Sequence, residues 1–267
     1  INVLCEKPVA LHAEEVEEII RAEKDHGVIY MPGFVNRLRH DVQKVLSIIR
    51  SGEIGDLENI NAKWLRRQGV PRPGTWFTNR ELSGGGVLID LGSHIIDICL
   101  LALKDKFAMN YELKTCKFQG NSDTGFANWF KADYFSEYVA DVEDTACAII
   151  HYSDGTILNV SLSWLAPIKG DCTYFEFIGT KGSIKLKTLF GFSDERLWKE
   201  DTLSVRIGEQ LHKEKLDGLN STYMAFERML KLFVDALKGE KAFMGSFDAL
   251  RTVTTIEKLY SVEISVP

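Results

Sequence analysis

The chain has 267 residues, a net charge of −6, 45% hydrophobic and 26% charged residues, which is an ordinary composition for one large globular domain or two modest ones. It shows no run of Lys or Arg, and we see no apolar stretch near the roughly 18–20 residues that span a bilayer. Five cysteines are scattered without a CxxC pair. We therefore expect a cytoplasmic protein with reduced thiols that binds neither nucleic acid nor membrane.

The first elements predict a parallel βαβ unit. Residues 2–6 have the pattern of a buried strand, residues 12–26 that of an amphipathic helix, and residues 28–31 that of a second strand. A buried strand seldom lies at a chain end, so we expect the chain to be the later part of a longer one. The apolar residues expected to be partly uncovered, or covered by another chain, are Val3, Leu4, Val28 and Ile29.

The rest of the chain predicts an α+β domain. A helix over residues 41–51 and a strand over 57–66 precede a long loop, residues 67–83, and then an apolar helix that begins after three glycines. Six further strands, two helices and a last short strand are expected at residues 111–118, 144–152, 156–164, 173–178, 183–186, 203–207, 221–238, 247–260 and 262–266. We therefore predict an α/β (α+β) fold whose open, mostly antiparallel sheet carries helices on one face.

Three polar residues share one stripe of the central apolar helix. At about 100° per residue, Asp90, His94 and Asp97 point the same way. Such a stripe is costly to bury unless each group has a partner or a task. Three interpretations remain open. Asp90 can orient His94 as a general base, His94 can be a satisfied core residue, or the three can bind a divalent metal, for which no second pair of ligands has suitable spacing.

Other residues suggest chemistry less directly. Lys7 follows the first strand, at the end where open α/β sheets bind ligands, although most lysines are simply solvated. The glycines Gly84–Gly86 favour a close backbone approach over a phosphate cradle, and no GxGxxG motif occurs. Four further residues can either line a polar ligand pocket or simply fill loops and core, and the sequence does not favour one role over the other: Arg66, Arg67, Trp76 and Trp164.

Several short motifs follow one another in a specific order. They are Glu6-Lys7-Pro8, Gly33-Phe34-Val35-Asn36-Arg37, Ser83-Gly84-Gly85-Gly86, Asp90-Leu91-Gly92-Ser93-His94, Val142-Glu143-Asp144, Ser163-Trp164 and Ile178-Gly179-Thr180-Lys181-Gly182. In this order the chain resembles the glucose–fructose oxidoreductase, inositol dehydrogenase and rhizopine-catabolism (Gfo/Idh/MocA) family. The resemblance implies an oxidoreductase that uses NAD or NADP on a sugar, inositol or related polyol, with residues 1–32 as the end of a Rossmann domain and 33–267 as the substrate-binding and oligomerisation domain.

The same resemblance implies the site residues. Lys7, Asp90 and His94 would be catalytic, and Asp97 would support His94 from behind. Cofactor contacts would come from Glu6, Lys7, Pro8 and Asn36, and the Lys7–Pro8 bond would be cis. Substrate contacts would come from Arg37, Trp76, Asp90, His94 and Trp164. No metal is expected.

The chain also departs from the family pattern, because the glycine-rich first half of the Rossmann domain is absent. We therefore expect the chain alone to bind NAD(P) weakly or not at all. The family's open sheet implies a homodimer or homotetramer. The competing hypothesis is a non-catalytic sugar-binding or oligomerisation module left by truncation.

Overall fold

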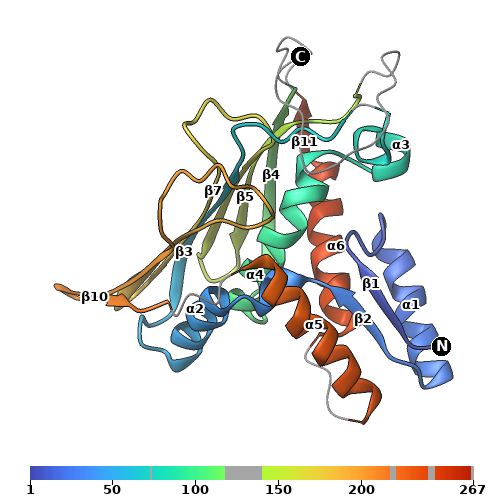
Figure 1. Ribbon diagram of the computed structural model, residues 1–267, viewed down its shortest axis with the longest axis horizontal. Coiled ribbons are helices and arrows are strands. Elements are labelled where there is room, and N and C mark those ends of the chain that lie inside the picture. The colour runs from blue at the N-terminus through green and yellow to red at the C-terminus, as the bar shows by residue number, and fades with distance from the viewer. Residues whose placement is uncertain (73, 118–139, 217–220, 240–243, 266–267) are drawn as a thin grey trace.

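The chain forms a small two-stranded sheet beside a large nine-stranded one (Figure 1). The structure is a computed structural model and describes residues 1–72, 74–117, 140–216, 221–239 and 244–265. The described helices gather on one side of the large sheet, as Figure 1 shows, and leave its other face open. The predicted α/β (α+β) class, with a mostly antiparallel open sheet, is confirmed.

The small sheet belongs to the predicted βαβ unit. Strand β1 (Val3–Glu6) pairs in parallel with β2 (Tyr30–Gly33), and helix α1 (Ala13–His26) connects them. The Glu15 carboxylate accepts the backbone N–H groups of Leu11 and His12, both at 2.9 Å, which satisfies donors at the start of α1. The residues expected to be partly uncovered are all of intermediate exposure: Val3, Leu4, Val28 and Ile29.

The large sheet has the strand order β10-β9-β8-β7-β3-β6-β5-β4-β11. Its strands are β3 (Leu57–Leu65), β4 (Ala108–Cys116), β5 (Thr145–Tyr152), β6 (Ile157–Ser163), β7 (Cys172–Gly179), β8 (Gly182–Thr188), β9 (Thr202–Ile207), β10 (Gln210–Glu214) and β11 (Glu263–Ser265). Strands β5 and β6 form one antiparallel hairpin, and β7 and β8 form another. The sheet is not a simple meander, because β3 lies between β6 and β7 and pairs in parallel with β6.

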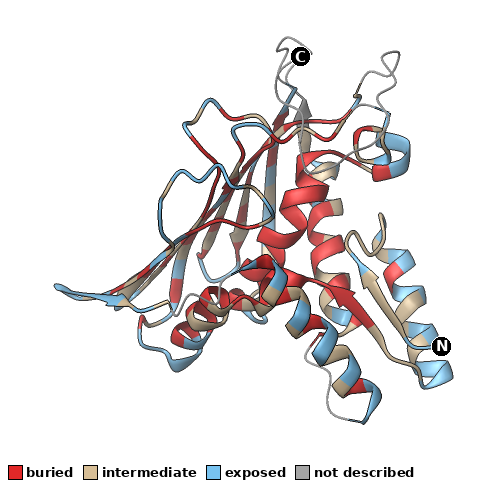
Figure 2. Ribbon diagram, viewed as in Figure 1, coloured by how far each residue is buried: buried red, intermediate tan, exposed pale blue. Residues whose placement is uncertain are grey.

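The helices cover one face and enclose the main core. The long ones are α2 (His40–Ser51), α4 (Ser93–Leu103), α5 (Thr222–Leu237) and α6 (Ser246–Ser261). The predicted loop 67–83 contains two short helices, η2 (Trp76–Thr78) and α3 (Arg80–Ser83), and two other short turns are η1 (Val35–Leu38) and η3 (Leu88–Gly92). Figure 2 shows α4 buried along nearly its whole length.

The central apolar run is longer than the sequence suggested. The helical stretch Arg80–Leu103 is long and apolar enough to cross a membrane by length and composition, so the statement that no stretch approaches that length is wrong. However, 94% of its most apolar window is buried inside the protein, which is the environment of a core helix.

The three glycines before this helix allow a close approach of other chain segments, as predicted. A Cβ on Gly86 would lie 1.9 Å from the backbone oxygen of Glu143, and one on Gly85 would lie 2.0 Å from the Tyr260 hydroxyl. The buried Glu143 carboxylate accepts the N–H of Gly86 at 2.9 Å, that of Leu88 at 3.2 Å and the Tyr260 hydroxyl at 2.7 Å. Glu143 therefore caps the start of the central helix.

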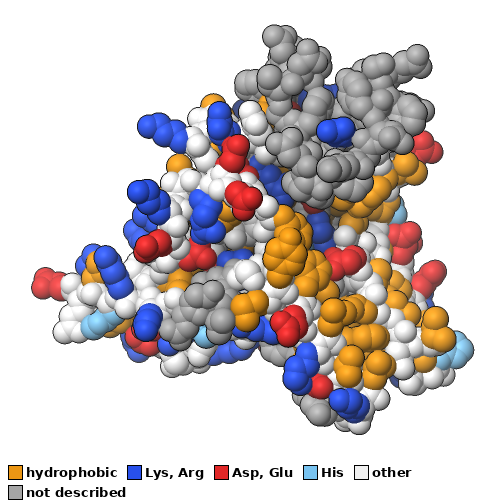
Figure 3. Space-filling model, in the orientation of Figure 1, with side chains coloured by type: hydrophobic (Ala, Val, Ile, Leu, Met, Phe, Trp, Pro, Cys, Tyr) orange, Lys and Arg blue, Asp and Glu red, His pale blue; other side chains and the backbone are white. Residues whose placement is uncertain are grey.

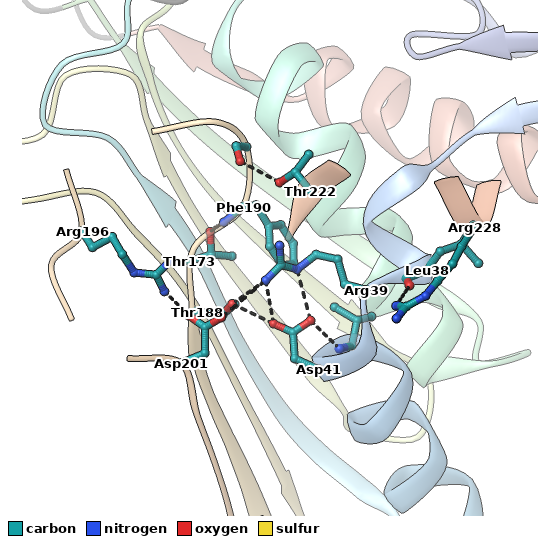
Figure 4. Close-up of polar contacts among 12 residues, drawn as sticks. Leu38, Arg39, Asp41, Thr173, Thr188, Phe190, Arg196, Asp201, Thr222 and Arg228 are labelled. Atoms are coloured by element: carbon teal, nitrogen blue, oxygen red, sulfur yellow. Dashed lines mark hydrogen bonds and ion pairs between the residues drawn. The ribbon is translucent and has the colours of Figure 1, made fainter. Parts of the chain in front are cut away.

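A buried ion pair fixes the start of α2 against β8 (Figure 4). The Arg39 guanidinium donates to both carboxylate oxygens of Asp41, at 3.1 and 2.9 Å, and to the Thr188 hydroxyl at 2.9 Å. Both charged side chains are at most 1% exposed. Arg39 also lies over the Phe190 ring at 4.9 Å, so the pair supports the segment that follows β8.

A second, smaller apolar cluster joins the βαβ unit to the last two long helices. It contains Val16 from α1 and Met31 from β2, together with residues of α5 and α6 such as Met229 and Ala249. Figure 3 shows apolar side chains gathered on the surface over α5 and the neighbouring βαβ unit. Three exposed apolar residues of α5 are Leu230, Val234 and Leu237.

Candidate active site

A cleft of about 740 Å³ opens where the two sheets approach each other. Its walls come from the end of β1, from η1, from the end of β3, from the start of the central helix, from the segment after β8 and from the start of α5. Ligand sites are usually concave and mainly apolar, with a few converging polar groups. This cleft has that composition, and the predicted residues Lys7, Asp90 and His94 all line it.

Lys7 and Asp90 form the central ion pair of the cleft. The Lys7 ammonium lies 2.6 Å from Asp90 Oδ1 and donates to the Asp90 backbone oxygen at 2.8 Å. The Trp164 indole N–H donates to Asp90 Oδ2 at 2.9 Å. Burial would raise the pKa of Asp90, but the charges of Lys7 and Arg66 and these hydrogen bonds lower it to about 2. Asp90 therefore stays charged and holds the Lys7 ammonium in place.

His94 lines the same cleft as a neutral imidazole. It is 7% exposed, and its ring lies 5.9 Å from that of Trp64. Burial, with the charges of Lys7 and Arg66, lowers the pKa of His94 well below its usual value, and the Asp90 charge only partly opposes this. Its Nδ1 atom has no hydrogen-bond partner among the described residues. The imidazole is therefore uncharged at neutral pH, and one of its ring nitrogens has a lone pair for a hydrogen bond or a proton.

The predicted contact between Asp90 and His94 is wrong. The Asp90 carboxylate accepts from Lys7 and Trp164, and no hydrogen bond joins it to His94 among the described residues, so it does not fix the imidazole tautomer. The reason is local geometry: residues Leu88–Gly92 form a π-helical turn, η3, which departs from the assumed 100° per residue. Such turns inside helices are frequent at functional sites. The turn directs Asp90 toward β1, from which Lys7 arrives.

Asp97 and Arg37 form a separate buried pair. The Arg37 guanidinium donates to Asp97 through Nε at 2.6 Å and through Nη2, and its Nη1 lies 2.8 Å from Asp248. Arg37, predicted to contact the substrate, is 2% exposed and is not among the residues that line the cleft. Asp97 therefore ties the central helix to η1 and α6, and no contact with His94 is described.

Several further polar groups converge on the cleft. Arg66, at the end of β3, is buried over the Trp64 ring at 5.1 Å, and the buried Asp171 lines the same wall. Besides His94, two lining residues have buried polar atoms without a hydrogen-bond partner in the described chain: Asn36 Oδ1 and the Trp64 indole N–H. Buried polar groups are rarely left unpaired, so these atoms indicate a polar ligand. No group of three or more His, Cys, Asp or Glu that could hold a metal occurs among the described residues.

Comparison with known proteins decides the family. The family model "GFO/IDH/MocA C-terminal domain" matches residues 42–185, and "Oxidoreductase family, NAD-binding Rossmann fold" matches residues 1–34. The chain belongs to the Gfo/Idh/MocA oxidoreductase family. A related Gfo/Idh/MocA protein of Amycolatopsis mediterranei, named as the oxidoreductase subunit of UDP-kanosamine synthase, is 34% identical over 77% of this chain and 56% of its own length. D-glucoside 3-dehydrogenase of Escherichia coli is 32% identical over 63% of this chain and 46% of its own length.

Solved structures confirm the Gfo/Idh/MocA fold. An aldose-aldose oxidoreductase of Caulobacter crescentus covers 98% of this chain with a TM-score of 0.76 and 19% identity; the match covers 69% of that protein. Levoglucosan dehydrogenase in complex with NADH and L-sorbose gives a TM-score of 0.76 at 18% identity, covering 98% of this chain and 70% of its own. The chain spans about half the length of the curated relatives it matches.

The structure brings most of the predicted Gfo/Idh/MocA site residues together. Those that line the cleft are Glu6, Lys7, Asn36, Trp76, Asp90 and His94. The Lys7–Pro8 bond is cis, as the resemblance implied, and Pro8 lines a small neighbouring cavity. Trp164, predicted to contact the substrate, is 1% exposed, is not among the residues that line the cleft, and donates its indole N–H to Asp90.

Sequence reasoning missed several residues of the cleft wall. Trp64 and Asp171 reach it through pairing of distant strands, and Phe192 and Phe226 reach it from the segment after β8 and from α5. Arg66 was named as a candidate pocket residue, because it lies at the end of the predicted strand over 57–66. For the others, no spacing in the sequence connects them with Lys7 or His94.

Proposed function

We propose that the chain is the catalytic and substrate-binding portion of an NAD(P)-dependent oxidoreductase that interconverts a secondary alcohol of a sugar, inositol or related polyol and the corresponding ketone. The observation that carries this proposal is the Lys7 ammonium, held 2.6 Å from a charged Asp90, with a neutral His94 in the same cleft. This arrangement supplies a proton acceptor and a fixed positive charge for one substrate oxygen.

The residues at the end of β1 fit the nicotinamide end of the cofactor. Glu6, Lys7 and Asn36 line the cleft there, and the unpartnered Asn36 Oδ1 can accept a hydrogen bond from an amide. The nicotinamide supplies the acceptor or donor of the hydride when it is bound. The 267 residues contain no GxGxxG motif, so they assign neither a phosphate cradle nor a choice between NAD and NADP.

Each polar group then has a task in alcohol oxidation. His94 accepts the hydroxyl proton at a ring nitrogen. Lys7 has three N–H donors, two of which bind Asp90, and the third is available to polarise the substrate oxygen. In ketone reduction His94 returns the proton. The unpartnered Trp64 indole N–H and Asn36 Oδ1 suit the hydroxyl groups of a polyol, since each would otherwise remain buried and unsatisfied.

The test is hydride transfer by the protein expressed from its complete reading frame. Formation of reduced nicotinamide is followed with NAD⁺ or NADP⁺ and a panel of polyols and glycosides. We expect His94→Ala to lower kcat/KM roughly 10²–10⁴-fold, the contribution of a general base. His151→Ala is the matched control, because that histidine pairs with Glu112 on the large sheet away from the cleft. Absence of turnover with all substrates would favour the non-catalytic module instead.

We also propose a homodimer or homotetramer formed through the open face of the large sheet, in a reducing, cytoplasmic compartment. Figure 1 shows no helix over that face, and all five cysteines are free. Light scattering during size-exclusion chromatography measures the mass directly, and a monomer at micromolar concentration would contradict the proposal.

A further inference from the structure

The outer part of the cleft is unusually rich in aromatic side chains. Trp76 and Phe77 come from η2, Phe192 from the segment after β8, and Phe226 from α5, and all four line the cleft. Trp76 is 40% exposed and Phe192 is 48% exposed. Large apolar side chains exposed together in one cleft usually mark a ligand site. We call these four residues the aromatic rim.

The rings of the rim are already arranged against one another. Trp76 and Phe77 stack with their centroids 3.8 Å apart. The ring centroids of Phe192 and Phe226 lie 6.3 Å apart in a stacked arrangement, and the Tyr223 ring lies 5.4 Å from that of Phe192. These contacts hold the rings in place while Trp76 and Phe192 stay exposed. A flat ligand group could therefore stack on the rim without ordering it first, which lowers the cost of binding.

The charges around the rim select against an anionic ligand. Asp194 and Glu195 lie two and three residues after Phe192 and line the cleft with it, and Glu195 is paired with Arg67 at 3.4 Å. Among the residues that line the cleft, five carboxylates face two permanent cations, Lys7 and Arg66, and Lys7 is paired with Asp90. A diphosphate placed beside Phe192 would meet the Asp194 carboxylate and the excess of negative charge along the cleft, and would be repelled. A neutral group would not.

We propose that the aromatic rim is a subsite for a neutral, flat aglycone, so that the preferred substrate is an uncharged glycoside with an aromatic aglycone. Such a substrate is favoured over a free sugar and over a nucleoside diphosphate sugar. This inference rests on the proposed function, because it places the reacting sugar beside Lys7 and His94. The aglycone takes no part in the hydride transfer and contributes binding alone.

Calorimetric titration of the 267-residue chain tests the subsite. The probes are methyl and 4-nitrophenyl β-glycosides of glucose, galactose and xylose, with UDP-glucose as the anionic probe. For at least one sugar, we expect the nitrophenyl glycoside to bind about 3- to 10-fold more tightly than the methyl glycoside, as one stacking contact would give. UDP-glucose should bind more weakly than 4-nitrophenyl glucoside.

Variants of the rim assign this difference to its rings. Phe192→Ala and Trp76→Ala should remove most of the preference for nitrophenyl, whereas Phe192→Tyr should keep it. Phe247→Ala is the matched control, because Phe247 is 66% exposed on α6 and does not line the cleft. Equal affinities of the two glycosides, a preference that survives Phe192→Ala, or tightest binding of UDP-glucose would each overturn the proposal.

Turnover separates this inference from the proposed function. A rim-dependent preference for nitrophenyl glycosides, without any NAD(P)-linked oxidation by the protein expressed from its complete reading frame, would support the subsite and contradict the enzyme. Oxidation of methyl and nitrophenyl glycosides with the same KM would support the enzyme and overturn the subsite.

Discussion

Asp90 carries its charge inside the protein because one ammonium, one guanidinium and one indole surround it. Its folded-state pKa of about 2 lies below its usual value of 3.8, so the carboxylate stabilises the folded chain above about pH 4. That contribution, on the order of 2 kcal/mol, declines as the pH falls below 4 and is lost near pH 2.

Urea unfolding of wild type and Asp90→Asn measures this directly. We expect the difference in unfolding free energy between the two proteins to be larger at pH 7 than at pH 3. A difference that does not change with pH would show that Asp90 titrates alike in the folded and unfolded chains.

His94 shows the opposite balance, because burial outweighs its one acidic neighbour. We expect its imidazole resonances to stay those of the neutral form from pH 8 down to pH 5.5 in NMR spectra. His12 provides an internal reference: it is exposed, and its hydrogen bond with Glu257 raises its pKa, so it should titrate above 6.5. A His94 midpoint near 6.5 would show that burial does not lower the pKa of this imidazole.

At the scale of elements, the entry into the central helix depends on one glycine. A Cβ at Gly86 would meet the backbone oxygen of Glu143 at 1.9 Å, so Gly86→Ala must displace either the helix start or its cap. We expect a loss of about 2 kcal/mol or more in unfolding free energy, the range of an overpacked core. Gly245→Ala is the control, because nothing lies within 4 Å of its Cβ position and its φ is −125°. Equal losses in both variants would contradict this account.

The Arg39–Asp41 pair joins α2 to the large sheet. Removing one partner alone should destabilise the protein more than removing both. Arg39→Met leaves a buried carboxylate without its cation, which should cost about 3–5 kcal/mol. Arg21→Met removes a pair exposed on α1, 3.9 Å from Glu17, and should cost at most about 0.5 kcal/mol. Chemical denaturation compares them. The double variant Arg39→Met with Asp41→Leu should be more stable than Arg39→Met alone; a further loss would argue against charge burial as the cause.

Elements and site residues differ in how far the sequence predicts them. Helices α1 and α2 were predicted within a residue or two, because apolar spacing and a terminal glycine are local signals. Strand β10 was missed, since most of its residues are exposed and carry no alternation, and the insertion of β3 depends on pairing between segments a hundred residues apart. Lys7, Asp90 and His94 were found from ordered motifs. Phe192 and Trp64 reach the cleft only through that long-range pairing.

At the scale of the whole molecule, the smaller apolar cluster determines whether residues 1–32 and the last two long helices unfold together. Residues 1–32 were predicted to be the end of a separate Rossmann domain. Val16 and Met31 from this segment share a cluster with Met229 and Ala249 of the last two long helices. A segment with its own core would open independently, whereas a segment that shares a core should lose protection together with its neighbours.

Met31→Ala distinguishes these two possibilities. Met31 is fully buried, so its truncation should cost about 2–5 kcal/mol in the unit to which it contributes. Because α6 packs against both α1 and β2, we expect native-state hydrogen exchange to accelerate in α6 as well as in β1 and β2. Exchange in β5 and β6, which belong to the main core, should change less. Faster exchange confined to residues 1–32 would show that this segment is energetically separate from the helices on which it packs.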